Sequence, residues 1–598
     1  MIVLGLSFFY HDAAAALLVN GRLVAAAEEE RFSRRKHDSD FPERAIRFCL
    51  AQAGLTVGDV DHVVFYEKPL LKFQRLLTTL AAHAPRTAGT FREAMVSWLG
   101  EKLWIKPLIQ DRLGLPADKI LFCEHHLSHA ASAFFCSPFK EAAVLTIDGV
   151  GEWSTATLGR GTARWEDGGA NRLDLFSEIR FPHSLGLFYS AFTAFLGFEV
   201  NEGEYKVMGM APYGTPRHVD KVWKLLRLSE DGSFELDLSY FSFQHDRWRT
   251  YSPKFERLFG PARNPRARFV TETTSLCDDT TPPAAAEINR NQYYADVAAS
   301  VQRVTEEIVL KMARHLHRVT GLKSLCVAGG VALNSVANHR LLKETPFEDI
   351  YIQPAAGDAG GALGAALYVE HAVAGNPRRF VMDRADWGRS NSPSEAADFY
   401  LSIGVGFEEY SDENRLLDRV AGLLLDGRVT GWVQGRFEWG PRALGHRSIL
   451  ADPRRREMKD IVNTKIKFRE PFRPFAPSVP EERAVEFFDF PEPERHLPPR
   501  FMQMVAPVRA DKQAVLPAVT HVDGTGRLQT VSPMVSPLFH RLIDRFGSAT
   551  GVPVILNTSF NLRGEPIVSN PQEAWRTFQA SGMDALVVEN LVVVKEVR

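Results

Sequence analysis

Short apolar runs that end in polar or glycine-rich turns recur along the chain. Residues 2–7 form one such run, residues 13–19 a second, and a third ends at 28–30 after the turn Asn20-Gly21. Apolar runs of about four to eight residues bounded by turn signals are typical of buried strands, and Asn-Gly is a hairpin signal. The first thirty residues therefore predict three strands, the last two joined as a hairpin.

The same pattern returns further along and predicts a duplicated unit. Residues 142–147 form an apolar run, 148–151 a polar turn and 154–158 a second run, which we expect to end in a glycine turn at 159–161. Strand, polar turn, strand and glycine turn in two copies resemble the actin-like, sugar-kinase-like ATPase fold (ASKHA), whose nucleotide lies between the halves. We therefore expect an α/β fold of this type.

Helical periodicity and loop composition fill in the rest of the first part. Residues 41–54 and 291–320 carry apolar positions at helical spacing and predict amphipathic helices. Residues 203–214 are rich in glycine and interrupted by proline, so we interpret them as an irregular, functional loop.

A change of composition divides the chain. Residues 376–394 shift to Pro, Arg, Asn and Ser, which is typical of a linker. We expect a first domain at 1–375 and a second, α+β domain at 395–598, beginning with a helix at 413–425 and a strand at 429–433. A chain of 598 residues is too long for a single core, which agrees with two domains.

Composition excludes several classes of function. A formal net charge of -2 gives no global attraction to nucleic acid or to an anionic membrane, so neither is expected as a partner. Five cysteines without CxxC spacing argue against a disulfide framework or a cysteine zinc site. We found neither a signal peptide nor an apolar run of membrane-spanning length, and expect a cytoplasmic protein. The oligomeric state is not readable.

A histidine pair is the first candidate site. Residues 119–123 predict a strand, and the alanine-rich stretch after Glu124 predicts a helix on which His125 and His129 share one face. Two neutral imidazoles at this spacing bind one divalent metal if further ligands complete the shell. The alternative is that these histidines, with His126, only satisfy backbone groups at the start of a helix.

Two glycine-rich turns are candidates for nucleotide binding. The predicted strands 324–328 and 349–352 run into 329–334 and 354–361, and each turn opens a helix. Such turns direct backbone N–H groups toward an anion, although a tight strand-helix turn is the simpler explanation. The second turn also supplies Asp358 at the carboxyl end of a strand.

The second domain concentrates cations beside hydroxyl and amide groups. In an extended segment, Lys467 and Arg469 would share a face, as would Ser559 and Asn561. Such groups suit a phosphate that bears a small planar acyl group, whereas solvated or ion-paired surface residues are the alternative. The candidates are Arg442, Lys467, Arg469, Arg473, Arg527, Ser559 and Asn561.

Over essentially its whole length the chain resembles the O-carbamoyltransferases of the NodU/CmcH/TobZ family. The motifs that carry the resemblance are His11-Asp12, residues 29–37, His125-x-x-x-His129, Asp148-Gly149, residues 203–209, residues 329–334, Gly357-Asp358, residues 440–445, residues 467–474 and residues 557–561. The resemblance implies a YrdC-like second domain and a transfer of carbamoyl from carbamoyl phosphate, through carbamoyl adenylate made with ATP and Mg²⁺, to a hydroxyl-bearing small molecule.

The resemblance also implies roles for residues. It implies that His125, His129, Asp148 and Asp358 together coordinate Fe(II). The same types of ligand also bind Zn or Mn, which are the alternatives. It suggests His11 as base, Asp12 as its orienting partner and Lys36 as a stabiliser of developing charge. Carbamoyl adenylate would bind at Gly329, Gly330, Asn334 and Gly357. The second-domain cations would hold phosphates, and Ser559 and Asn561 the carbamoyl end or the nucleotide.

Three other functions remain open: an actin-fold small-molecule kinase, a tRNA threonylcarbamoyladenosine-type modification enzyme, and a metal-stabilised scaffold.

Residues 60–115 and 215–285 are irregular in composition and lie next to the motifs, so we expect them to shape the acceptor pocket.

Overall fold

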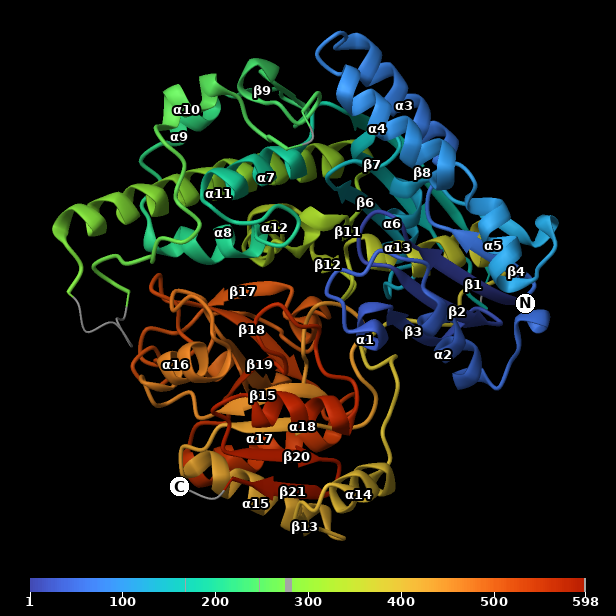
Figure 1. The fold of residues 1–598 in the computed structure, drawn as a ribbon. Helices are drawn as coiled ribbons and strands as arrows, with labels where there is room; N and C mark the ends of the chain where they lie inside the picture. The colour runs from blue at the N-terminus through green and yellow to red at the C-terminus, as the bar shows by residue number, and fades with distance from the viewer. Residues whose placement is uncertain (167, 247, 275–281, 596–598) are drawn as a thin grey trace. The chain divides into compact units, whose positions relative to one another are not determined.

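The computed structural model describes residues 1–166, 168–246, 248–274 and 282–595, and the chain divides into two compact units (Figure 1). Unit 1 comprises residues 1–29, 39–268 and 289–382. Unit 2 comprises the described parts of 30–38, 269–288 and 383–595. Both units contain helices and sheets, as expected for an α/β protein.

The first sheet of unit 1 is built around the N-terminal strand. Its strands are β1 (Ile2–Ser7), β2 (Ala14–Val19), β3 (Arg22–Glu28), β4 (His62–Phe65) and β5 (Ile120–Phe122), in the order β3-β2-β1-β4-β5. Strand β1 pairs antiparallel with β2 and parallel with β4. The core-facing residues are small and aliphatic, with Val3, Leu4 and Leu6 fully buried.

The second sheet repeats this design. Its strands are β6 (Glu141–Ile147), β7 (Ser154–Thr162), β8 (Arg172–Arg180), β11 (Ser324–Ala328) and β12 (Asp349–Tyr351), in the order β12-β11-β6-β7-β8. Its central strand β6 pairs antiparallel with β7 and parallel with β11. The same strand order and directions in both sheets confirm the predicted actin-like duplication.

Two helices packed against each other connect the sheets of unit 1. Helix α6 (His125–Phe134) lies against α13 (Asp358–Leu367), and glycine makes this approach close. A Cβ added at Gly364 would lie 1.8 Å from the backbone oxygen of Ser128. This contact brings the first turns of α6 and α13 together.

The other regular elements of unit 1 surround these layers. Its remaining helices are α2 (Glu43–Ala53), α3 (Pro69–Ala82), α4 (Ala88–Ser97), α5 (Ile105–Leu113), α7 (Leu185–Phe195), α8 (Glu204–Met210), α9 (Val219–Trp223), α10 (Pro253–Phe259), α11 (Ala285–Thr320) and α12 (Ser335–Glu344), of which α11 begins in unit 2. Strands β9 (Leu226–Leu228) and β10 (Phe234–Leu236) form a small hairpin.

Two local predictions in unit 1 are wrong. The expected glycine turn at 159–161 lies inside β7. Glycine is needed there for packing and not for a turn, because a Cβ at Gly161 would lie 2.6 Å from the ring of Phe134. The expected irregular loop at 203–214 contains α8 and a short 3-10 turn at 211–213. Val207 and Met210 are buried three residues apart, so apolar burial overrides the glycine-rich composition.

Unit 2 is built on a mixed sheet. The order of its strands is β13-β21-β20-β14-β15-β19-β16-β18-β17. Their bounds are β13 (Glu408–Glu409), β14 (Thr430–Val433), β15 (Arg447–Ala451), β16 (Ala476–Pro480), β17 (Met504–Pro507), β18 (Thr525–Val531), β19 (Ile555–Ser559), β20 (Ala585–Val588) and β21 (Leu591–Val594). Its helices are α1 (Glu30–Ser33), α14 (Pro393–Ser402), α15 (Glu413–Leu425), α16 (Met458–Ile461), α17 (Pro537–Thr550) and α18 (Pro571–Gln579).

The core of unit 2 lies between this sheet and two helices. Leu417 and Leu424 of α15 pack with Leu542 and Phe546 of α17 against Trp432 of β14, and all are fully buried. Helix α15 has the bounds expected from its apolar periodicity.

The segment between the predicted domains is held by hydrogen bonds. Residues 375–392 form no helix or strand, yet Arg378 is fully buried and donates a hydrogen bond of 2.9 Å to the oxygen of Phe139. The N–H of Met382 likewise donates to Cys136. From Asp383 onward the chain belongs to unit 2.

Two expectations from composition can be compared with the described residues. No helix among them combines the length and the apolar character needed to cross a membrane. Cys49, Cys123, Cys136 and Cys326 are reduced and buried, and Cys277 lies outside the described residues.

Candidate functional site

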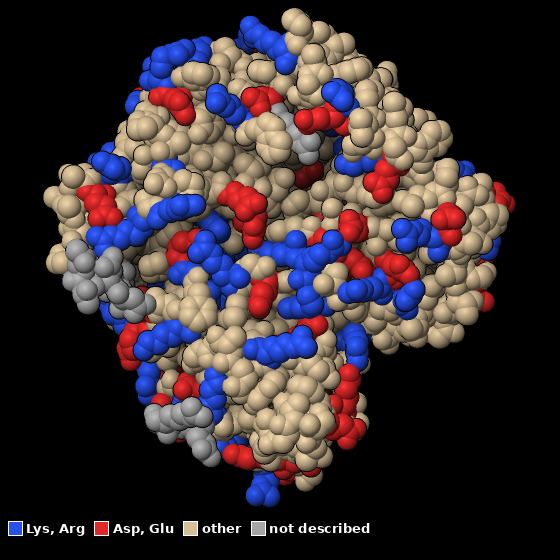
Figure 2. All heavy atoms as spheres, viewed as in Figure 1, with Lys and Arg blue, Asp and Glu red and all other residues tan. Residues whose placement is uncertain are grey.

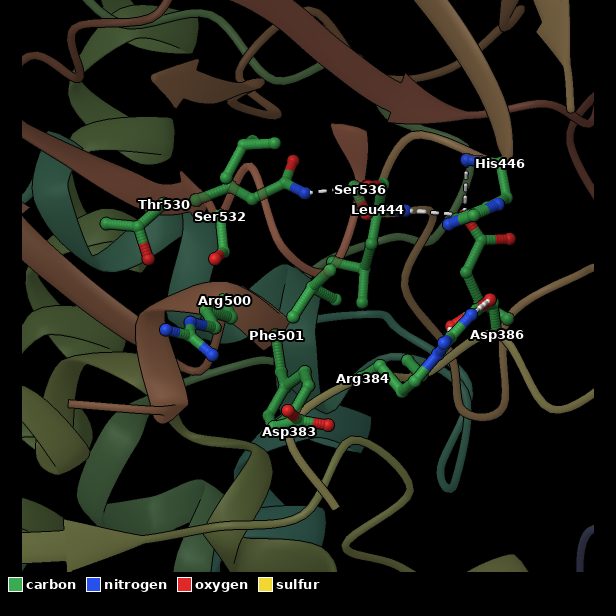
Figure 3. Close-up of a pocket in the computed structure, with 15 residues that line it drawn as sticks. Asp383, Arg384, Asp386, Leu444, His446, Arg500, Phe501, Thr530, Ser532 and Ser536 are labelled. Atoms are coloured by element: carbon green, nitrogen blue, oxygen red, sulfur yellow. Dashed lines mark hydrogen bonds and ion pairs between the residues drawn. The ribbon is translucent and has the colours of Figure 1, made fainter. Parts of the chain in front are cut away.

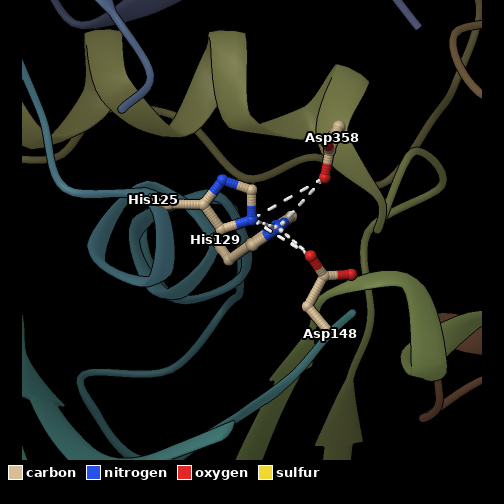
Figure 4. A group of neighbouring side chains, drawn as sticks. All are labelled: His125, His129, Asp148 and Asp358. Atoms are coloured by element: carbon tan, nitrogen blue, oxygen red, sulfur yellow. Dashed lines mark hydrogen bonds and ion pairs between the residues drawn. The ribbon is translucent and has the colours of Figure 1, made fainter. Parts of the chain in front are cut away.

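Two histidines and two aspartates meet in unit 1 (Figure 4). His125 and His129 lie one turn apart on α6, Asp148 follows β6, and Asp358 opens α13. The His125 Nε2 atom lies 3.1 Å from Asp148 Oδ2 and 3.8 Å from Asp358 Oδ1. The corresponding distances from His129 Nε2 are 3.8 and 3.6 Å. The structure thus brings together all four residues predicted as metal ligands.

The spacing of these atoms suits a divalent metal. Four donors about 2.1 Å from one ion stand roughly 3–3.5 Å apart, close to the distances in this cluster. The two imidazole Nε2 atoms lie 3.1 Å apart, and both face the aspartate oxygens. Since two nitrogen atoms and two carboxylate oxygens converge on one point, the donor set fits a metal ion.

The turn after β11 holds Asp148 in position. The Gly330 N–H donates a hydrogen bond of 2.8 Å to Asp148 Oδ1, which leaves Oδ2 directed at the histidines. Gly329 has a φ of 93°, and a Cβ there would lie 2.2 Å from the oxygen of Ile147. Glycine is therefore required for this turn to reach the strand that ends at Asp148.

Charge and burial act in opposite directions on the cluster. Burial disfavours a charged His125, but hydrogen bonds to Asp148 and Glu67 outweigh it and raise its pKa to about 10. Burial would raise the pKa of Asp148, yet the two histidines hold it well below the usual value. His126 differs: burial lowers its pKa to about 3, and its Nδ1 pairs with Thr146 Oγ1 at 2.7 Å. His126 is therefore a neutral core residue outside the cluster.

Glu67 is a residue that the sequence analysis missed. It is fully buried, its Oε2 lies 3.5 Å from His125 Nδ1, and Lys72 Nζ lies 2.7 Å from the same oxygen. A carboxylate behind a ligating imidazole fixes the orientation of the ring and its tautomer. The sequence feature that could have identified Glu67 is its position two residues beyond the apolar strand β4, because α/β sites lie at the ends of strands.

Changing Glu67 to glutamine should weaken metal binding by about 10- to 100-fold, because an outer carboxylate orients the ligand and raises its basicity. The measurement is metal affinity by competition with a chelator, at one pH. Glu124→Gln is the matched control, since Glu124 adjoins His125 but is exposed and pairs with Lys68. Equal affinities of Glu67→Gln and the parent protein would contradict this role.

His11 and Asp12 form a second pair in unit 1. His11 Nδ1 lies 2.7 Å from Asp12 Oδ2, and both side chains are about one-third exposed. Burial would lower the pKa of His11, but Asp12, with smaller contributions from Asp358 and Asp148, raises it to about 9. A carboxylate in contact with Nδ1 orients the imidazole ring, as in a catalytic His-Asp pair.

The residues of unit 1 that we predicted to bind carbamoyl adenylate differ in whether their polar groups already have hydrogen-bond partners. Nothing lies within 4 Å of a Cβ built at Gly357, so the start of α13 faces open space. Asn334 is already used: its Oδ1 accepts from Ala337 N–H at 3.2 Å, capping α12, and its amide pairs with Gln302. The Gly330 N–H is likewise used by Asp148.

A buried lysine is the centre of the candidate site in unit 2. Lys467 Nζ donates hydrogen bonds of 2.7 Å to the backbone oxygens of Ser559 and Asn561, and also contacts Ser559 Oγ and Asn561 Oδ1. Burial, followed by the charges of Arg469 and Arg473, lowers its pKa well below the usual value. Ser559 and Asn561 thus hold the ammonium group in place.

Further cations surround Lys467. Burial, followed by the charges of Arg442 and Arg473, lowers the pKa of Arg527, so these three guanidinium groups influence one another. Arg473 has Glu470 at 3.6 Å, whereas Arg469 stacks over Phe475 and donates to Asn463 at 2.7 Å. The nearby cations that help to lower the pKa of Lys467 and of Arg527 favour an anionic ligand.

One sequence expectation about this group changes. Lys36, whose role in stabilising charge stays a prediction, belongs to unit 2, where its charge contributes to the lowered pKa of Lys467. Lys467 does not lie in an extended segment, because it follows a π-helical turn at 462–466 and Phe468 has a φ of 48°. The proximity of Lys467 and Arg469 arises from this turn rather than from strand alternation.

Neither the surface charge nor a cavity elsewhere in unit 2 gives further evidence about this candidate site. Figure 2 shows both signs of charge interspersed on the visible face, in agreement with a net charge of -2. A polar cavity in unit 2 is lined by Asp383, His446, Arg500 and Ser532 among others (Figure 3). Its charges are paired internally, as in the 2.6 Å bond from Arg384 to Asp386. Among the described residues, none of those predicted for substrate binding lines it.

Comparisons with known proteins agree with one another. The family model described as carbamoyltransferase N-terminus matches residues 2–367, and that described as carbamoyltransferase C-terminus matches residues 421–595. These two matches cover most of the chain, and each falls mainly within one structural unit.

Two individual relatives extend over nearly the whole chain, and a third over less than half of it. An uncharacterized protein of Synechocystis sp. is 46% identical over 99% of this chain and 96% of its own length. The nodulation protein NolNO of Sinorhizobium fredii is 38% identical over 98% of this chain and 79% of its own length. A 3'-hydroxymethylcephem-O-carbamoyltransferase of Amycolatopsis lactamdurans is 34% identical over 44% of this chain and 47% of its own. The chain therefore belongs to the carbamoyltransferase family and is a carbamoyltransferase.

Proposed function

We propose that this carbamoyltransferase is ATP-dependent and works in two steps, each in its own unit. The observation that carries the proposal is the presence of two chemically different sites on one chain. Unit 2 holds a buried cation group around Lys467, and unit 1 holds the His₂Asp₂ cluster. Cations suit phosphate substrates, whereas a metal cluster suits activation of a carbonyl or phosphoryl oxygen.

The first step forms carbamoyl adenylate in unit 2. Water cleaves carbamoyl phosphate to carbamate and phosphate. A carbamate oxygen then attacks the α-phosphorus of ATP, the bond between that phosphorus and the αβ-bridging oxygen breaks, and pyrophosphate leaves with Mg²⁺. Lys467, Arg469 and Arg473 stabilise the charge that develops on the phosphorus, with Arg442 and Arg527 holding the other phosphates. Fixed donors need no reorganisation during the reaction, and this is usually the largest catalytic contribution.

A bound anion would also benefit Lys467 itself. In the free protein, burial and neighbouring cations disfavour its charged form. Two phosphate-bearing substrates supply the missing negative charge, and the ammonium group then binds them without further rearrangement because Ser559 and Asn561 hold it. Lys36 belongs to the same group and would stabilise charge in this step.

The second step transfers the carbamoyl group in unit 1. The acceptor hydroxyl oxygen attacks the carbamoyl carbon, the bond from that carbon to the adenylate oxygen breaks, and AMP leaves. His11, oriented by Asp12, takes the hydroxyl proton. Because its pKa is raised to about 9, the neutral form that acts as a base is the minority form at neutral pH. Gly357, where the start of α13 faces open space, offers backbone to the adenylate.

The metal is held by His125, His129, Asp148 and Asp358, and when bound it supplies Lewis acidity toward a carbonyl or phosphoryl oxygen. Two imidazoles with carboxylates suit Fe(II), and Zn(II) or Mn(II) accept the same donors. The chain's own contribution is to orient these ligands, through Gly330 on Asp148 and Glu67 on His125.

The acceptor is a hydroxyl-bearing natural product or sugar. The printed name of the Amycolatopsis relative, a hydroxymethylcephem carbamoyltransferase, supports this class. Residues 60–115, and the described part of 215–285, stay our candidates for the acceptor pocket. The net charge of -2 supports a small molecule over tRNA.

Incubation with ATP and carbamoyl phosphate should yield pyrophosphate and carbamoyl adenylate, which water converts to AMP when no acceptor is present, and only when both substrates are present. The adenylate route requires cleavage between the α- and β-phosphates, whereas a kinase cleaves the γ-phosphate. Chromatographic separation of AMP from ADP is the measurement. ADP as the dominant nucleotide product would replace this proposal with the actin-fold kinase, and AMP only in the presence of tRNA would favour the modification enzyme.

A further inference from the structure

Glu152 is a buried carboxylate of unit 1 that has no part in either proposed reaction step. Its side chain is only 7% exposed. It lies in the loop 148–153 between β6 and β7, which begins with Asp148, one of the candidate metal ligands. Removing a carboxylate from water is costly unless hydrogen bonds compensate it. The partners of Glu152 therefore indicate what this group does in the core.

The hydrogen-bond partners of Glu152 are backbone N–H groups beside the metal cluster. The N–H of His125 donates hydrogen bonds of 3.0 and 3.2 Å to Glu152 Oε1 and Oε2. The N–H of Lys68 donates a hydrogen bond of 2.8 Å to Oε1. Lys68 directly follows Glu67, the carboxylate that lies 3.5 Å from His125 Nδ1. One side chain thus joins the segment after β4, the first turn of α6 and the loop that carries Asp148.

The residue at the N-cap position of α6 does not cap this helix. Glu124 occupies that position, but its side chain makes no capping hydrogen bond and pairs instead with Lys68 Nζ at 2.8 Å. The first N–H groups of a helix have no partners within the helix, and a carboxylate beside them is favourable. Glu152 supplies that carboxylate from 27 residues away, and so it fixes the backbone position of His125.

The loop that carries Glu152 is itself fixed in place. A Cβ at Gly151 would lie 2.9 Å from the Cβ of His125, so glycine allows the loop to pass this close to the histidine. Ser184 Oγ, which caps α7, donates a hydrogen bond of 2.6 Å to the backbone oxygen of Gly149. Because the loop is held at these points, the length of the Glu152 side chain determines where its two partners lie.

We propose that Glu152 is a positioning residue of the metal cluster, which holds the backbone of His125 and Lys68 so that Glu67 and Asp148 both reach this histidine. The proposal rests on metal binding at the His₂Asp₂ cluster. In this role the reach of the side chain matters more than its charge, because both partners are neutral N–H groups. The alternative is that the negative charge of Glu152 acts on the metal through space.

Two conservative variants separate reach from charge. Glu152→Gln keeps the length of the side chain and an oxygen that accepts from both N–H groups, but it loses the charge. Glu152→Asp keeps the charge but is one methylene shorter, so it does not reach both groups. The probe is Co(II) alone, with its affinity measured by competition with a chelator and its visible spectrum recorded at saturation. We expect an affinity within about threefold of the parent protein for Glu152→Gln, and one at least about tenfold weaker, with a changed spectrum, for Glu152→Asp.

The matched controls are Glu141→Gln and Glu141→Asp, at an exposed glutamate where β6 begins, and both should bind Co(II) as the parent protein does. Thermal melting without metal tests the fold of each variant. If Glu152→Asp does not fold, Glu152→Met replaces it, because methionine keeps the length but accepts no hydrogen bond from these N–H groups.

Two results would overturn the proposal. A loss of affinity in Glu152→Gln as large as in Glu152→Asp, or larger, would assign the effect to charge. Parent-like affinity and spectrum in both variants would make Glu152 a helix cap without influence on the cluster. A parent protein that binds no Co(II) would contradict the metal site itself, and this proposal with it.

Discussion

Replacing Lys467 by methionine should reduce AMP formation by about 10²–10³-fold, the usual cost of losing one fixed donor that stabilises developing charge. Methionine keeps the length of the side chain but cannot donate to a phosphate. Lys467 is 3% exposed and is held by Ser559 and Asn561, so no neighbouring cation can move into its place without losing its own contacts. The measurement is the rate of AMP release with saturating ATP and carbamoyl phosphate.

The stability of this variant distinguishes a catalytic role from a structural one. The pKa of Lys467 is lowered in the folded state, so the charged form destabilises the free protein at neutral pH. Losing the ammonium relieves that cost but leaves buried backbone oxygens unpaired, and the two effects oppose each other. We expect a similar melting temperature. The control is Lys465→Met, an exposed lysine two residues away, and a comparable loss of AMP formation in it would contradict the assignment.

Changing Asp148 to asparagine should strongly reduce carbamoyl transfer while leaving pyrophosphate formation in unit 2 intact. Asparagine retains an oxygen for the Gly330 N–H but removes the negative charge that faces both histidines. Loss of a charged ligand should lower metal content after chelation, and transfer should fall by about 10²-fold or more, as expected for loss of Lewis acid assistance. Metal analysis and carbamoylated product are measured on the same sample.

The control for this variant is Asp174→Asn, a partly exposed aspartate of β8 that pairs with Arg172. It should retain metal and both activities. If Asp148→Asn lost pyrophosphate formation as severely as transfer, the division of the two steps between the units would be contradicted.

Much of the fold could be predicted because its strands are short apolar runs bounded by turn residues. The duplicated pattern led to the two sheets of unit 1, and the apolar periodicity of residues 413–425 predicted α15. Where prediction failed, packing decided. Gly161 lies in a strand, and glycine occupies that position because the ring of Phe134 leaves no room for a side chain. Helix α8 forms because Val207 and Met210 become buried.

The candidate metal site could be only half predicted from spacing. His125 and His129 share a helical face, but nothing local joins them to Asp148 and Asp358, whose contribution was implied by the family resemblance. In the structure, Asp148 directly follows β6 and Asp358 follows β12, and β6 and β12 flank β11 in one sheet. Long-range topology, which residue spacing does not encode, brings the ligands together.

Glu67 and Lys36 also show that residue spacing does not reveal which side chains lie close together in the fold. Glu67 carries no motif, and its closeness to His125 arises from the parallel pairing of β4 with β5, whose chain continues into α6. Lys36 lies in a motif near the N-terminus, yet residues 30–38 pack with unit 2 because Arg31 and Arg34 donate to the backbone oxygens of Gly440 and Ile567. The assignment of Lys36 to unit 2 therefore depends on these long-range contacts, which its motif alone does not show.

The central claim is that carbamoyl adenylate connects the two sites, and an oxygen isotope label tests it most directly. Carbamoyl phosphate labelled at its carbonyl oxygen yields labelled carbamate, one of whose two equivalent oxygens becomes the bridge to the α-phosphorus and leaves with AMP. Mass spectrometry of AMP released during carbamoylation of an acceptor should therefore find the label in its phosphate. Unlabelled AMP beside a labelled carbamoylated product would contradict the adenylate route.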